Sequence, residues 1–164
     1  MRILGIDPGY ERLGIAVIEK EKGGKEEVLY SDCFKTSATL PHPERLLLIG
    51  TEVERVISEF HPEALAIETL FFNTNQKTAM HVSEARGTIL YAARKNGLVV
   101  YEYTPAAIKM AVTGYGKSGK EEMIKMVRLL VRVRSDIKHD DEYDAIAAGL
   151  ACFASLKTGN LSRT

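Results

Sequence analysis

Residues 1–10, MRILGIDPGY, decide the fold. The apolar run from Ile3 to Ile6 predicts a short buried strand, and the proline and glycine that follow predict a turn directly after it. Gly5, within the run, lets a neighbouring backbone come close. Asp7 is therefore expected at the C-terminal end of this strand. Its carboxylate either caps the turn or belongs to a functional site. Whether other acids reach the same edge of the sheet decides between the two interpretations.

Composition bounds the class of protein. A chain of 164 residues with 45% hydrophobic content predicts one compact domain, residues 1–156, followed by a flexible tail at 157–164. The 22 basic and 22 acidic residues cancel, so net charge alone does not indicate a nucleic-acid partner. The lack of a long apolar run or a signal-like N-terminus predicts a cytoplasmic protein without membrane contact. Cys33 and Cys152 lack metal-type spacing, which predicts reduced, partly buried thiols and argues against zinc and redox chemistry.

The apolar pattern predicts an α/β fold. Three strands in succession form an antiparallel start, and two later strands, entered through helices, lie parallel, which gives a five-stranded mixed sheet flanked by helices. The strands are predicted near residues 3–6, 13–18, 28–34, 64–68 and 98–101. Helices are predicted up to residue 60, over 79–96 and 105–112, around 123–131 and from 141, with loops at 69–78 and 114–119.

Two further motifs supply acids. Glu68 ends a short buried run, ALAIE, which repeats the design of the first strand. Asp141 and Asp144 are three positions apart, so they share one face of the first turn of a predicted helix. Acidic residues are also common in first turns for a simpler reason, because they interact favourably with the helix dipole. Asp140 and Glu142 crowd Asp141, so its assignment depends on the helix register.

Four acids that share one pocket repel one another, so the cluster requires cations. A donor set of carboxylate oxygens favours Mg²⁺, with Mn²⁺ as a substitute, over zinc. Two such ions, roughly 3.5–4 Å apart, can hold a phosphodiester and activate water for its hydrolysis. His139 is a candidate ligand or proton carrier, and equally a plain surface histidine.

Several motifs together resemble the RuvC family of crossover-junction endodeoxyribonucleases. They span residues 1 to about 155 and are GIDPG at 5–9, AIE at 66–68 followed by Phe71, EARG at 84–87, and the D-x-x-D-A-I-A pattern at 141–147. The resemblance implies a ribonuclease-H-like fold, a homodimer, and magnesium-dependent resolution of four-way (Holliday) DNA junctions by paired symmetrical nicks. It also implies a role in recombination and DNA repair, in company with the RuvA and RuvB branch-migration proteins. By the same resemblance the metal-binding catalytic acids are Asp7, Glu68, Asp141 and Asp144.

The resemblance also implies DNA contacts. Lys109 and Lys120 match family basic residues that engage the DNA backbone, and Phe71 matches an aromatic near the junction. Phe71 or the adjacent Phe72 could instead be a core residue. Further basic candidates are Lys117 and Arg128, the latter on a predicted helix face with Lys125 and Arg132 that is either a phosphate-binding stripe or a solvated face.

Parts of the sequence also resemble motifs of nucleotide-binding proteins. The sequence GYGKSGK at 114–120 approaches a phosphate-binding loop but is followed by Glu121 in place of the required Ser or Thr. Sugar kinases and actin-like ATPases share the first turn, but 164 residues leave no room for their second domain. Two alternatives stay open: a related nuclease that acts on RNA or linear duplex, and a non-catalytic junction-binding protein.

Overall fold

The structure, a computed structural model, describes residues 1–70, 76–133 and 137–158. It contains a mixed sheet with the strand order β5-β4-β1-β2-β3-β6. The first three strands pair antiparallel, and β4 and β5 pair parallel beyond β1, which confirms the predicted sheet. The strands are β1 Arg2–Asp7, β2 Arg12–Glu19, β3 Glu27–Lys35, β4 Ala64–Glu68, β5 Val99–Tyr103 and β6 Arg132–Val133.

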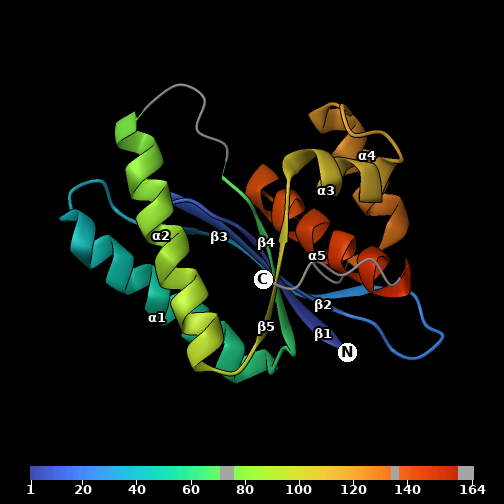
Figure 1. Cartoon of the computed structure of the whole chain (residues 1–164), viewed down its shortest axis with the longest axis horizontal. Coiled ribbons are helices and arrows are strands. Elements are labelled where there is room, and N and C mark those ends of the chain that lie inside the picture. Colours follow the sequence, from blue (N-terminus) through green and yellow to red (C-terminus); the bar gives the residue numbers. More distant parts are fainter. Residues whose placement is uncertain (71–75, 134–136, 159–164) are drawn as a thin grey trace.

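In the described parts of the chain, five helices cover the two faces of the sheet (Figure 1). They are α1 His42–Phe60, α2 Gln76–Lys95, α3 Pro105–Thr113, α4 Lys120–Leu130 and α5 Asp140–Thr158. Figure 1 shows α1 and α2 on one face and α5, with α3 and α4 beside it, on the other. Within the described part of the chain, no helix combines the length and the apolar character needed to cross a membrane.

The element boundaries differ from the prediction in three places. The helix α2 begins at Gln76, inside the predicted loop at 69–78, and α5 continues to Thr158. The strand β6 was not predicted, because two residues are too few for an alternating pattern; it pairs parallel with the start of β3. This pairing ends α4 at Leu130, so Arg132 is a strand residue and not part of the predicted helical stripe.

The first strand is buried on both faces. Leu4 and Ile6 belong to the cluster under α1 and α2, whereas Ile3 belongs to the cluster under α5. All three side chains are inaccessible to solvent. A strand buried on both sides reads as a continuous apolar run, which is why the sequence of β1 shows no alternation.

Small residues bring α5 into close contact with the sheet. A Cβ atom at Gly5 would lie 2.1 Å from the carbonyl oxygen of Ala145, and one at Gly149 would lie 2.3 Å from the Ile18 side chain. The helix therefore seats directly on the backbone of β1 and on β2. This confirms the predicted close approach at Gly5 and fixes where the N-terminus of α5 lies.

Candidate active site

Neighbouring parallel strands present two of the predicted acids side by side. Asp7 is the last residue of β1 and Glu68 is the last residue of β4. The two strands pair in a register that aligns Ile6 with Ile67. Because the next residue on each strand is the acid, Asp7 and Glu68 occupy equivalent positions at the same edge of the sheet.

The first turn of α5 brings the other two acids to this edge. A Cβ atom at Gly14 on β2 would lie 2.1 Å from the carbonyl oxygen of Asp141 and 3.1 Å from the Cβ atom of Asp7. Only a glycine lets the helix backbone approach this closely. Asp144, one turn further along α5, lines the same cavity as Glu68. All four predicted acids therefore converge.

Glu142 has a structural role that fixes the register of α5. Its Oε1 accepts hydrogen bonds from the backbone N–H groups of His139 at 3.0 Å and Lys138 at 3.1 Å, and its Oε2 accepts one from Ser31 Oγ at 2.6 Å. An acid at the third helical position that binds the capping residue's N–H makes one of the two bonds of a capping box. Glu142 is thus committed to the helix start, which leaves Asp141 as the acid that faces the site. The His139 ring lies 3.3 Å from Lys35 Nζ.

Burial and mutual repulsion oppose ionisation of the acids. Burial, followed by the charges of Asp144, Glu68 and Asp141, raises the pKa of Asp7 to about 7. The pKa values of Glu68 and Asp144 are also raised, chiefly by burial. Without a cation, the cluster therefore retains a proton close to neutral pH.

Two basic residues partly neutralise the cluster. Arg12 forms an ion pair with Asp141 and donates to Asp140 Oδ1 at 3.0 Å. Lys120 pairs with Asp140 and lies 3.8 Å from Asp144 Oδ2. The Lys120 hydrogen bond holds the pKa of Asp140 well below its usual range. Arg12 was not predicted as a site residue, because no sequence spacing links the start of β2 to α5.

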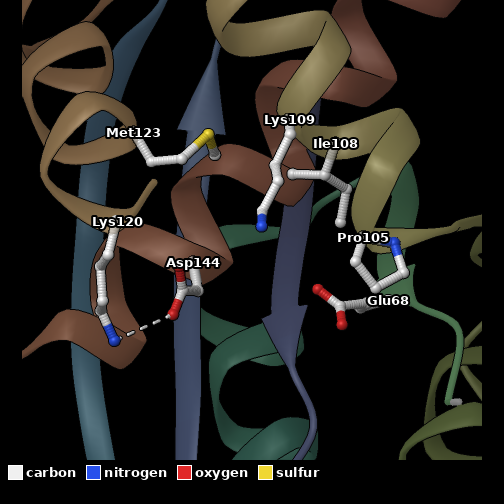
Figure 2. A pocket seen from close by; sticks show the side chains of 7 residues that line it. All are labelled: Glu68, Pro105, Ile108, Lys109, Lys120, Met123 and Asp144. Atoms are coloured by element: carbon white, nitrogen blue, oxygen red, sulfur yellow. Dashed lines mark ion pairs between the residues drawn. The ribbon is translucent and has the colours of Figure 1, made fainter. Parts of the chain in front are cut away.

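A cavity of roughly 170 Å³ opens beside the acids, with room for several waters or hydrated ions (Figure 2). Figure 2 shows Lys109 and Lys120 reaching it from α3 and α4, with Lys120 beside Asp144 and joined to it by an ion pair. The cavity thus holds cationic side chains together with carboxylates, as binding of a phosphodiester with metal ions requires. Its lining residues are Glu68, Pro105, Ile108, Lys109, Lys120, Met123 and Asp144.

Comparison with known proteins identifies the family. The family model "Crossover junction endodeoxyribonuclease RuvC" matches residues 3–152. The chain belongs to the RuvC family. A RuvC relative from Desulfitobacterium hafniense is 46% identical over 150 residues, which cover 92% of this chain and 90% of the relative.

Solved RuvC structures share the whole fold. The Thermus thermophilus RuvC structure aligns with a TM-score of 0.91 and 34% identity and covers 100% of both chains. The same protein in complex with a Holliday junction substrate aligns with a TM-score of 0.93 and 34% identity, covering 100% of this chain and 99% of that chain. The fold class and the resemblance inferred from the sequence are thereby confirmed.

The remaining candidates for DNA contact, Lys117, Arg128 and the pair Phe71 and Phe72, lie in different settings. Lys117 is exposed in the segment between α3 and α4. Arg128 donates from Nε to the Tyr143 hydroxyl at 2.7 Å, and its guanidinium lies 5.4 Å from the centre of that ring, so α5 holds its side chain. Phe71 and Phe72 lie outside the described residues.

The pH dependence of stability tests the charge state of Asp7. In chelator, rising pH is expected to destabilise the wild type relative to Asp7→Asn between about pH 4 and pH 7. The pKa of Asp7 rises from 3.8 to about 7 on folding, so over this interval the native state holds a proton that the unfolded state has released. Below the interval both states are protonated, and above it the difference is constant. Urea unfolding of both proteins across this range measures the effect, and a pH-independent difference would refute the assignment.

Proposed function

We propose that this protein is a magnesium-dependent endonuclease that resolves four-way DNA junctions by paired symmetrical nicks in recombination and DNA repair. The observation that carries the proposal is the convergence of four carboxylates, from two strand ends and one helix, beside a cavity lined by two lysines. RuvC membership supplies the substrate class. The function also predicts a cytoplasmic location, where chromosomal junctions form.

The acids fit a site for hard divalent cations. The donors that converge there are carboxylate oxygens, the ligands that Mg²⁺ and Mn²⁺ prefer. Burial, and after it the neighbouring carboxylates, raise the pKa of Asp7, and bound cations would offset both effects. We infer two ions per subunit, which would polarise the scissile phosphate and lower the pKa of the attacking water. The proposed ligands are Asp7, Glu68, Asp141 and Asp144.

The chain's own side chains position the substrate. Lys109 and Lys120 line the cavity together with two of the acids, so each is placed to bind a phosphate oxygen of the DNA. Lys120 must leave Asp140 to do so, since it pairs with that carboxylate in the free protein. The rigid strand ends of β1 and β4 hold Asp7 and Glu68 in place while the phosphate enters.

A cleavage assay on three substrates tests the proposed function. A mobile four-way DNA junction, a linear DNA duplex and an RNA duplex of matched sequence are incubated with Mg²⁺ or with chelator. Paired nicks in the junction alone, and only with Mg²⁺, are expected. Equal cleavage of the linear duplex or of RNA would favour the alternative nuclease, and junction binding without cleavage would favour the non-catalytic alternative.

The symmetry of the substrate leads us to propose a homodimer. Paired nicks in two strands require two active sites, which a two-fold dimer supplies. The helix α2 offers a surface, because Met80 and Tyr91 are 64% and 69% exposed and Gly87, on the same helical face, is open to contact. Sedimentation is expected to show a dimer at micromolar concentration, and a monomer with and without junction DNA would contradict it. RuvA and RuvB are the proposed partners in branch migration.

The salt dependence of junction binding tests the lysines. Lys109→Ala and Lys120→Ala are each expected to lower the slope of log affinity against log salt by about 1, because each loss leaves one phosphate without its cation. Lys95→Ala is the matched control, since Lys95 Nζ pairs with Glu54 at 2.9 Å on the opposite face of the sheet. Binding titrations on a junction at several salt concentrations give the slopes. An unchanged slope for Lys109→Ala or Lys120→Ala would place that lysine outside the DNA contact.

A further inference from the structure

A second cluster of metal-ligating side chains lies between α1 and α2, on the face of the sheet opposite α5. His42 is the first residue of α1, and His81 and Glu84 lie three apart on α2. Residues with this spacing share one helical face. One ligand atom from each of the three residues lies within 4.8 Å of the other two. The cluster therefore joins two helices that are far apart in sequence.

The contacts within the cluster bring nitrogen and oxygen donors of the two helices together. His42 Nε2 lies 2.7 Å from Glu84 Oε2, and the rings of His42 and His81 stack with their centres 4.0 Å apart. Two imidazoles and one carboxylate in this arrangement offer three ligand atoms to a single shared cation.

The surroundings leave part of the cluster unsatisfied. Among the described residues, His42 Nδ1 is buried and has no hydrogen-bond partner. The centre of the Tyr10 ring lies 5.8 Å from the centre of the His42 ring and 5.0 Å from that of His81, with its plane steeply inclined to both. Glu84 is 49% exposed, so an ion can reach the cluster from solvent. A cluster that served only to hydrogen-bond α1 to α2 would be expected to pair both ring nitrogens and to be closed to solvent.

We propose that His42, His81 and Glu84 bind one divalent transition-metal ion of the Zn²⁺ class, which links α1 to α2. Two imidazoles and one carboxylate suit Zn²⁺ and not Mg²⁺, and three protein ligands leave a fourth position for water. A tetrahedral ion with bonds of about 2.0–2.1 Å requires ligand atoms roughly 3.3 Å apart. The three ligand atoms already lie within 4.8 Å of one another, so small side-chain rotations bring them to this spacing.

One neighbouring charge opposes binding. The Arg45 guanidinium lies 4.7 Å from the centre of the Tyr10 ring, which contacts both histidine rings. Arg45 Nη2 lies 3.9 Å from Glu11 Oε1, which offsets part of this charge. The site is therefore expected to bind more weakly than a structural zinc site made of thiolates. The proposal rests on the geometry of the cluster and is independent of the proposed function.

The test uses the full chain in excess Mg²⁺, with Asp7→Asn as background so that the carboxylate site takes up little transition metal. Co²⁺ is titrated as a spectroscopic substitute for Zn²⁺, and the histidine ring signals are followed by NMR. The expected result is one site with the strong visible absorption of tetrahedral Co²⁺ and paramagnetic shifts of His42 and His81 alone. Zn²⁺ should raise the melting temperature, since an ion that binds only the folded state stabilises it.

Matched variants on the same background decide the assignment. His81→Gln is expected to weaken Co²⁺ binding by about tenfold or more and to abolish the Zn²⁺ stabilisation. His61→Asn is the control, because His61 lies outside the cluster, at the end of α1 with φ 50, a conformation that asparagine tolerates. If His81→Gln fails to fold, the exposed Glu84→Gln takes its place with the same expectation. Two results would overturn the proposal: the weak absorption of octahedral Co²⁺, or equal Co²⁺ affinity with and without His81→Gln. The cluster would then be only a structural contact between α1 and α2.

Discussion

Replacement of Asp7 by asparagine is expected to lower junction cleavage by several orders of magnitude while the fold and junction binding persist. The amide keeps the shape of the carboxylate but is a poor ligand for a hard cation, so the ions that activate water are lost. The lysines that line the cavity are unchanged, so DNA affinity is retained. Single-turnover cleavage and a binding titration on the same junction separate the two quantities.

Melting measurements distinguish this loss from a folding defect. In chelator, Asp7→Asn should be at least as stable as the wild type at neutral pH, because one of four repelling charges is gone. Mg²⁺ should stabilise the wild type more than the variant. Asp32→Asn, at an exposed position of β3, is the control and should change neither quantity. A variant that melts early yet still cleaves junctions would make Asp7 a turn cap and not a catalytic acid.

The second large effect is expected at Gly14. A Gly14→Ala side chain would lie 2.1 Å from the Asp141 carbonyl oxygen, so the first turn of α5 must move away from β2. Overpacking of this kind destabilises by about 1–3 kcal/mol. The same movement separates Asp141 from Asp7, and a displacement of about 1 Å can lower the rate roughly 100-fold. Urea unfolding and single-turnover cleavage measure both consequences.

Gly24→Ala provides the matched control for this substitution. A Cβ atom at Gly24 would meet its nearest neighbours at 3.5 Å, an ordinary van der Waals contact. Its stability and cleavage should therefore equal those of the wild type. If Gly14→Ala cleaves junctions at the wild-type rate, the close seating of α5 does not position the acids.

Much of this architecture could be predicted from local pattern. The runs that end in Asp7 and Glu68 are buried strands, and their carboxylates leave the sheet at aligned positions. Gly5 marked a close approach because a glycine in a buried strand has few other reasons to occur there. These features depend on residues within a few positions of one another, which is the range over which sequence patterns are informative.

The unpredicted features depend on contacts between distant segments. Arg12 meets Asp141 across 129 positions, and His42 meets Glu84 across 42. No periodicity or spacing reports such pairs. The predicted helical stripe failed at Arg132 because pairing with β3 overrides the helical pattern there. The crowding of Asp140 and Glu142 around Asp141 was resolved by the hydrogen bonds of Glu142, which the sequence alone left open.

The position of Lys120 makes cation binding and substrate binding interdependent. Its ammonium pairs with Asp140 and lies 3.8 Å from Asp144, so it competes with any cation for these oxygens. A phosphate that draws Lys120 away uncovers Asp144 and thereby raises the affinity of the site for divalent ions. Thermodynamic linkage makes the effect reciprocal, so the ions must tighten DNA binding by the same factor. Under the proposed function, the free protein would then hold its metal loosely and bind it fully only once the strand to be cut is in place.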